Sequence, residues 1–233
     1  MYEITLSGPA KNALGTKMMR WIQQELHRAE GQPVLITGSG DAFSAGLNLK
    51  ELADLDGDQM AQFLGELDAL LTAIFHYPAP TAAVINGHAI AGGCLIQLFC
   101  DVRIAQRGSG ARIGLNEVAL GLRFPPRLLN MIRYRVDPRH VEHVLLEAGL
   151  YDPETAEEFG LIDAVSDDAR AEAVAQLNRR ARNPAQAYAS AKADLRGHLL
   201  EDDGAATAKF NEDVLPVWTS NALKETIRGF LRR

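Results

Sequence analysis

Short apolar runs alternate with longer amphipathic runs along the first 105 residues of this chain. The short runs are bounded by glycine, proline or asparagine and resemble buried strands. In the longer runs apolar residues recur every three or four positions, as in helices that face a core. Strands that alternate with helices need crossover connections and favour a parallel sheet. The sequence predicts an α/β fold with a mostly parallel sheet, whose strands lie at 2–6, 33–37, 81–86 and 101–105.

Helices account for most of the remaining sequence. Long helices are expected at 14–30 and 58–76, between the predicted strands. After Pro125 the sequence changes to a series of helical runs, which predicts a helical C-terminal region. The acidic, glycine-containing EDDG at 201–204 is interpreted as a turn between two of these helices.

Length and charge exclude several classes of protein. A chain of 233 residues with 47% hydrophobic content is expected to form one main domain. Its net charge of −6 argues against a nucleic-acid partner. No apolar run reaches the roughly 18 to 20 residues of a membrane span, and no signal region is visible, so we expect a cytoplasmic protein without a membrane partner. Cys94 and Cys100 are expected to be reduced core residues.

Two loops rich in glycine and alanine, GSGDAFSAG (38–46) and GHAIAGG (87–93), each follow a predicted strand and precede a helix. Small residues let main-chain N–H groups approach a ligand closely, so these loops are candidate donors to an oxyanion. Ordinary strand-to-helix turns explain the composition equally well. A dinucleotide site is disfavoured, because Phe43 stands where the fingerprint needs its third glycine.

Other catalytic patterns find little support. No phosphate-binding G-x-x-x-x-G-K-S/T pattern occurs, and no G-x-S-x-G elbow surrounds Ser44 or Ser109. His140 and His143 lie three residues apart on a predicted helix, but a zinc site needs three or four ligands, so a partly exposed helix is the preferred interpretation. No metal is predicted.

One acidic residue stands out from its surroundings. Glu117 is the only acid in the apolar segment RIGLNEVALGL (112–122). A carboxyl group in a dry setting has a raised pKa and suits general-base catalysis near neutral pH. The competing interpretation is a solvent-exposed carboxylate in a turn.

Taken together, several segments resemble the crotonase (enoyl-CoA hydratase/isomerase) superfamily, whose members bind acyl-CoA thioesters. The resemblance implies a crotonase-like spiral of ββα units over residues 1–165 and a helical C-terminal region over 166–233 that covers the active site or mediates trimer contacts. It also implies a homotrimer or a dimer of trimers. The matching segments, in order, are KNALG (11–15), ITGSGDAFSAGLNLKEL (36–52), YPAPTAAVINGHAIAGGCLIQLFCDVRIA (77–105), RIGLNEVALGL (112–122) and AEEFGLIDAV (156–165).

The resemblance assigns roles to the two small-residue loops. It implies that the N–H groups of Ala45 and Gly92 form an oxyanion hole for the thioester oxygen. Ser44, Leu47 and Leu49 are expected to line the groove for the CoA moiety. No cofactor is implied, because coenzyme A enters as part of the substrate.

The resemblance also narrows the reaction. Hydratases of the family carry two glutamates, and this chain has Leu95 at the first position and Glu117 at the second. The segment IGLNEVALG is similar to the Δ3,Δ2-enoyl-CoA isomerases, in which one carboxylate moves a proton from C2 to C4. Leu95 is then expected to contact substrate. Apolar neighbours should keep water from the dienolate, namely Ile113, Leu115, Val118 and Leu120.

Two alternatives stay open. Another crotonase-type enzyme, such as an enoyl-CoA hydratase, an acyl-CoA hydrolase or a different isomerase, would use the same loops with another acid. A non-catalytic acyl-CoA-binding relative would bind without turnover.

The chain departs from the family pattern in a few places. It begins at the strand that many relatives place second, Asn48 stands where Asp is usual, and Arg123 and Arg127 replace small residues, which leaves the acyl-chain preference open. The candidates for binding the CoA phosphates are Lys50, Arg112 and Lys209.

Overall fold

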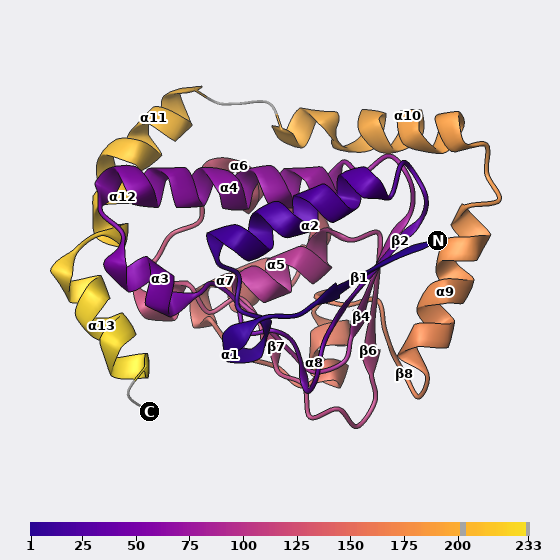
Figure 1. The fold of residues 1–233 in the computed structure, drawn as a ribbon, viewed down its shortest axis with the longest axis horizontal. Helices are drawn as coiled ribbons and strands as arrows, with labels where there is room; N and C mark the ends of the chain where they lie inside the picture. Colours follow the sequence, from indigo (N-terminus) through magenta and orange to yellow (C-terminus); the bar gives the residue numbers. More distant parts are fainter. Residues whose placement is uncertain (201–203, 232–233) are drawn as a thin grey trace.

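The computed structural model describes residues 1–200 and 204–231 of the chain, which form two parallel sheets enclosed by helices (Figure 1). The larger sheet has five strands in the order β1-β2-β4-β6-β8, and every neighbouring pair is parallel. The predicted α/β class and parallel sheet are therefore confirmed. The strands are β1 (Tyr2–Leu6), β2 (Val34–Gly38), β4 (Thr81–Ile85), β6 (Val102–Gln106) and β8 (Ala164–Ser166).

A second, three-stranded sheet was not expected. It consists of β3 (Ala42–Ser44), β5 (His88–Ile90) and β7 (Ile113–Gly114), again all parallel. Each of these strands follows a strand of the larger sheet along the chain, which gives the succession of ββα units. The prediction that 38–46 and 87–93 are simple loops was wrong at this point, because strands of two or three residues are too short to show a period of two.

The predicted long helices are confirmed with shifted ends. The helix α4 begins with a capping box, in which Asp56 accepts a hydrogen bond from the Gln59 N–H at 2.9 Å and the Gln59 side chain accepts one from the Asp56 N–H at 3.0 Å. The helices of the first half are α1 (Pro9–Asn12), α2 (Thr16–Arg28), α3 (Leu49–Asp54), α4 (Gly57–Phe75) and α5 (Gly92–Phe99).

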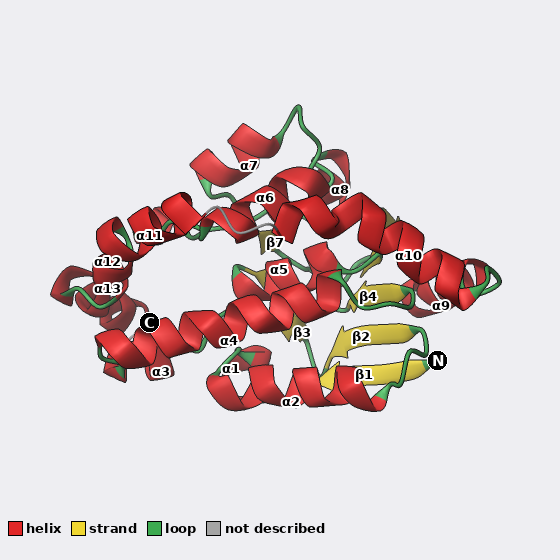
Figure 2. Ribbon diagram, turned by 90° about the horizontal axis from the view of Figure 1, so that it is seen from above, coloured by secondary structure: helices red, strands yellow, loops and turns green. Residues whose placement is uncertain are grey.

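The C-terminal part is helical, as predicted, and its helices separate to opposite ends of the molecule. Figures 1 and 2 show α9 at one end and α11 to α13 at the other. The turn predicted at 201–204 falls largely on residues 201–203, outside the described residues. The helices are α6 (Pro126–Arg135), α7 (Val141–Glu147), α8 (Pro153–Glu158), α9 (Ala169–Arg180), α10 (Ala185–Arg196), α11 (Gly204–Asp213), α12 (Leu215–Trp218) and α13 (Asn221–Leu231), with 3₁₀ turns η1 (Val118–Leu120) and η2 (Gly197–Leu200).

The larger sheet is covered on both faces. The main core packs α2, α4 and α5 against one face, and it continues to α12 and α13 through Trp218 and Leu223. A smaller core joins the other face to α9, where Ala173 and Leu177 pack with Val84 and other strand residues. Among the described helices, none combines the length and the apolar character that crossing a bilayer requires.

A buried ion cluster ties α10 to the sheet. Asp101, just before β6, accepts hydrogen bonds from the Thr81 N–H at 2.9 Å, the Lys192 Nζ at 2.8 Å and the Tyr188 hydroxyl at 3.1 Å. Arg196 pairs with its other carboxylate oxygen at 2.8 Å. Because the two cations are themselves buried, removing the carboxylate leaves them without compensation.

We therefore expect Asp101→Asn to lower the free energy of unfolding by about 3–5 kcal/mol. The control is Asp41→Asn, which breaks an ion pair with Lys11 whose side chains are 80% and 50% exposed; such pairs contribute about 1 kcal/mol or less. Urea denaturation of both variants measures the difference. Equal, small losses would show that the cluster does not hold α10 in place.

Candidate active site

Three chain segments meet at the carboxyl ends of β3, β5 and β7. Because these strands are parallel, the segments that follow them emerge at the same edge of the small sheet. They enclose a cavity of about 100 Å³. Leu223 and Ile227 of α13 also line it. Its lining is mainly apolar and comprises Ala45, Leu47, Leu49, Leu52, Ile90, Ala91, Asn116, Glu117, Leu120, Leu122, Leu223 and Ile227.

Glu117 is placed by a tight turn after β7. Its carbonyl oxygen accepts hydrogen bonds from the N–H groups of Leu120 and Leu122, both at 3.0 Å. Gly121, at φ 76°, adopts the left-handed conformation that ends the turn and that glycine tolerates best. Leu122 is buried and anchors the returning chain. The backbone thus fixes Glu117 at the wall of the cavity.

The Glu117 side chain is buried, and one of its carboxylate oxygens has no partner among the described residues. The residue is 7% exposed, and its Oε2 atom has no hydrogen-bond partner among the described residues. Burial raises the pKa of the carboxyl to about 8, because water no longer stabilises the charged form, whereas a backbone hydrogen bond lowers the pKa. The interpretation of Glu117 as a solvent-exposed carboxylate is therefore wrong. A group with such a pKa can accept and return a proton near neutral pH.

A narrow second compartment, of about 20 Å³, adjoins Glu117 on the side of α4 and α5. It shares Leu47 and Glu117 with the first cavity, and Leu95, which is 2% exposed, forms part of its wall. The remaining lining residues are Leu64, Leu67, Gly92, Arg123, Phe124, Pro125, Leu128 and Trp218. Glu117 is the one carboxyl group among the described residues that line either compartment.

The expectation that the Ala45 N–H donates to the oxyanion is wrong. Its side chain lines the cavity, but its N–H donates a hydrogen bond to the Lys11 carbonyl oxygen at 3.0 Å. The Leu47 N–H donates to no described residue. The Leu14 N–H donates to the Gly46 carbonyl oxygen and the Leu14 carbonyl oxygen accepts from the Asn48 N–H, so this pairing does not use the Leu47 N–H. Leu47 therefore supplies a free main-chain donor just after this loop.

Gly92 supplies a second free donor. Its N–H opens α5 and donates to no described residue. The preceding Ala91 has φ 50° and ψ −121°, a strained conformation of the kind that is often found at functional sites. The two donor segments touch: a methyl group on Gly46 would lie 3.4 Å from the Gly92 nitrogen, and one on Gly92 would lie 2.9 Å from the Leu47 Cδ2.

The other expected contacts are partly corrected. Leu47 and Leu49 line the cavity, but Ser44 is fully buried, and its hydroxyl donates to the Asn12 carbonyl oxygen at 2.8 Å, so it does not line the groove. Val118, expected to exclude water, is 40% exposed. Asn48 caps α3 by accepting a hydrogen bond from the Glu51 N–H at 3.4 Å.

Residues missed from the sequence include the Leu47 N–H, Asn116 and the C-terminal side chains Trp218 and Ile227. The Asn116 Oδ1 is buried without a partner beside Glu117. Only the adjacency of Asn116 to Glu117 in the sequence pointed to it. The positions of Trp218 and Ile227 depend on how α12 and α13 fold back, which no local pattern reveals.

Charged and metal-binding candidates lie elsewhere. Lys50, Arg112 and Lys209 are exposed and line neither compartment. His140, just before α7, stacks on Phe159 with ring centroids 4.7 Å apart, and His143 on α7 is exposed, which agrees with a partly exposed helix. The described residues contain no group of three or more His, Cys, Asp or Glu side chains placed to hold a metal ion.

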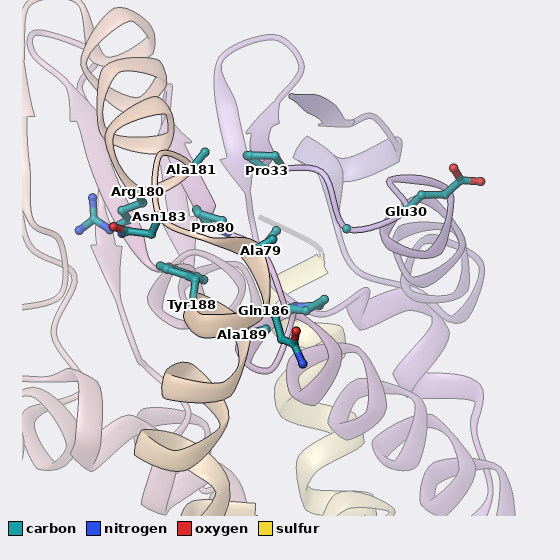
Figure 3. Close-up of a pocket in the computed structure, with 13 residues that line it drawn as sticks. Glu30, Pro33, Ala79, Pro80, Arg180, Ala181, Asn183, Gln186, Tyr188 and Ala189 are labelled. Carbon is teal, nitrogen blue, oxygen red and sulfur yellow. The ribbon is translucent and has the colours of Figure 1, made fainter.

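A separate cavity of about 430 Å³ lies between α10 and the chain that enters β2 and β4. Figure 3 shows Tyr188 and Ala189 on one wall, near Ala79 and Pro80. None of the expected site residues lines it, and the Tyr188 hydroxyl is engaged by Asp101. The expected residues Ala45, Leu47 and Leu49 gather at the other cavity, beside Glu117.

Comparison with known proteins agrees with the fold. A family model described as "Enoyl-CoA hydratase/isomerase" matches residues 1–233. The chain belongs to the enoyl-CoA hydratase/isomerase family. A protein of Thermus thermophilus named for enoyl-CoA hydratase activity is 30% identical to this member over 96% of the chain and 90% of its own length.

Solved structures confirm the crotonase fold of this family member. The human mitochondrial delta3-delta2-enoyl-CoA isomerase matches with a TM-score of 0.87 and 23% identity, covering 99% of this chain and 92% of that one. The enoyl-CoA hydratase from Bacillus halodurans matches with a TM-score of 0.83 and 23% identity, covering 97% and 95%. Both likenesses concern the fold.

The buried carboxyl predicts a pH-dependent stability. Because the pKa of Glu117 is raised to about 8 in the folded state, the folded protein keeps a proton that the unfolded chain releases near pH 4.5, and stability falls as pH rises between these values. We expect Glu117→Gln, which is always neutral, to be more stable than the parent by about 2–4 kcal/mol at pH 8.5 and nearly equal to it at pH 5.

Thermal and urea unfolding at both pH values measure this difference. Glu142→Gln, the same change at an exposed position of α7, is the matched control and should show no pH-dependent gain. A pH-independent effect at Glu117 would mean that the carboxyl is not held in a dry setting.

Proposed function

We propose that the protein is a Δ3,Δ2-enoyl-CoA isomerase, which shifts a double bond of an acyl-CoA thioester from position 3 to position 2. The observation that carries the proposal is the single carboxyl group, Glu117, in a cavity whose other walls are mainly apolar. A proton transfer between two carbons of one substrate needs one group that alternately accepts and donates.

Two main-chain donors serve the thioester oxygen in this proposal. The free N–H groups of Leu47 and Gly92 polarise the carbonyl and stabilise the negative charge that develops on its oxygen. Removing one such donor from comparable sites costs about 10²- to 10³-fold in rate. Because the strained Ala91 and the glycines fix the backbone before substrate binds, the donors need little reorganisation.

Glu117 carries the proton. Its carboxylate removes a proton from C2 of a 3-enoyl thioester, and the electron pair delocalises over the thioester oxygen and C4 as a dienolate. The same carboxyl group then delivers the proton to C4. The C3–C4 double bond becomes a C2–C3 double bond, so that atoms and charge balance, and the reaction requires no metal and no cofactor apart from the CoA of the substrate.

The two compartments suggest how the substrate lies. The larger one is lined by several half-buried residues, including Leu49 and Leu120, and suits the pantetheine arm, which must reach solvent. The smaller one, beyond Gly92 and Leu95, has mostly buried walls and a volume of about 20 Å³, and it suits the end of a short acyl group. Glu117 lines both compartments, at the position where C2 and C4 would lie.

Hydration is the competing reaction, because the Thermus thermophilus relative is named for it. Adding water across a double bond requires a water molecule held and deprotonated next to the substrate. Leu95 offers no hydrogen bond for such a water, and no second acid lines the described cavity. These two features favour the isomerase over the hydratase.

We expect Glu117→Gln to lower kcat for 3-enoyl-CoA isomerisation by about 10²- to 10⁴-fold, because the amide keeps the shape but cannot accept the proton. The assay measures product formation from cis- and trans-3-enoyl-CoA, with hydration of 2-enoyl-CoA and release of free CoA followed in parallel. Near-parental isomerisation by the variant, or faster hydration than isomerisation by the parent, would refute the proposal. Glu142→Gln is again the control.

The pH profile offers an independent check. Because the unprotonated form of Glu117 is the base and its pKa is raised to about 8 by burial, kcat/KM should rise with pH and level off above about pH 8–9. A profile that is flat from pH 6 to pH 9 would contradict this assignment.

A further inference from the structure

The smaller compartment beside Glu117 is not purely apolar. Most of its walls are leucine side chains, Phe124 and Pro125, but Arg123 and Trp218 also line it. They come from distant parts of the chain, the segment before α6 and the end of α12. Both are hydrogen-bond donors and neither side chain accepts hydrogen bonds through its polar nitrogens.

Trp218 brings a buried donor to this compartment. The residue is 3% exposed, and its Nε1 atom has no hydrogen-bond partner among the described residues. Buried indole N–H groups usually find an acceptor, because an unmade hydrogen bond destabilises the folded state. A bound molecule with a hydrogen-bond acceptor can therefore pair with the indole N–H of Trp218.

Arg123 brings an unpaired positive charge. The neighbouring Arg127 pairs with Asp68, whereas Arg123 makes no ion pair or hydrogen bond with the described residues. Arg123 is exposed to solvent, but it lines the same compartment as the buried Trp218. No carboxyl group other than Glu117 lines this compartment in the described structure.

We propose that this compartment selects acyl-CoA thioesters whose short acyl group ends in a carboxylate, which Arg123 and the Trp218 Nε1–H bind. The proposal rests on the proposed function, because it assumes that the acyl group enters beyond Gly92 and Leu95. A carboxylate satisfies the donor of Trp218 and the charge of Arg123 together, whereas an alkyl chain satisfies neither.

The size of the compartment limits the length of the acyl group. Its volume of about 20 Å³ corresponds to roughly one water molecule. Arg123, being exposed, has room to move outward on binding, whereas Trp218, Leu67 and Leu128 are held in the core. In the proposed function C2 and C4 lie beside Glu117, so C5 is the first carbon that can reach this compartment, and a five-carbon chain with a terminal carboxylate is the probe of choice.

The test compares glutaryl-CoA with pentanoyl-CoA, which have the same carbon count and cannot isomerise. Isothermal titration calorimetry of the parent should show glutaryl-CoA binding at least about tenfold more tightly. Arg123→Gln should weaken glutaryl-CoA on the order of 10- to 100-fold and pentanoyl-CoA by less than about twofold. Trp218→Phe should reproduce the selective loss to a smaller extent, about three- to tenfold.

Arg133→Gln is the matched control, because it removes one exposed positive charge of α6 that lines neither compartment. Equal affinity of the parent for the two ligands, or a preference that survives Arg123→Gln, would overturn the proposal and leave the isomerase assignment intact. Failure of the folded parent to bind either ligand would instead refute acyl-CoA binding itself, and the proposed function with it.

Discussion

The parallel pairing of three very short strands is the constraint on which the site depends. β3, β5 and β7 pair through main-chain hydrogen bonds, and their pairing extends to Ala91, whose N–H donates to the Gly114 carbonyl oxygen at 2.9 Å. This bond joins the segment of Gly92 to the segment that leads into Glu117. The backbone therefore holds the Gly92 N–H and the main chain of the segment that leads into Glu117 in a fixed relation.

Two features next to these paired strands lower the stability of the folded protein. Ala91 adopts a backbone conformation that disfavours residues with a Cβ, and Glu117 is buried with an unpartnered oxygen. Ala91 and Glu117 line the same cavity, and the surrounding core of large buried side chains holds both in place. A strained backbone, as at Ala91, next to a desolvated carboxyl, as at Glu117, is typical of a site that acts on a ligand.

Much of the fold was predictable, because long strands and helices have periods that a single sequence displays. The strands β1, β2, β4 and β6 and the helices α2 and α4 follow from such patterns, whereas β3, β5, β7 and β8, of two or three residues each, are too short to have one, and β8 lies in the region that was predicted to be helical. At the site, Glu117 was identified from its apolar neighbours and from family resemblance. The shift of the donor from Ala45 to Leu47 was not, because it depends on which N–H the Lys11 carbonyl oxygen engages, a contact across 34 residues of sequence.

The origin of the cavity walls has a consequence for how such a protein can change. The groups assigned to bond making and breaking come from the repeated ββα units, whereas Trp218, Leu223 and Ile227 come from the last two helices. Replacing those helices would change which acyl groups fit the cavity. The proton-transferring carboxyl and the main-chain donors to the thioester oxygen would keep their positions. The part of the wall that comes from the last two helices can therefore diversify while Glu117, Leu47 and Gly92 are preserved, whereas Arg123 lies in the same stretch of chain as Glu117 and is constrained with it.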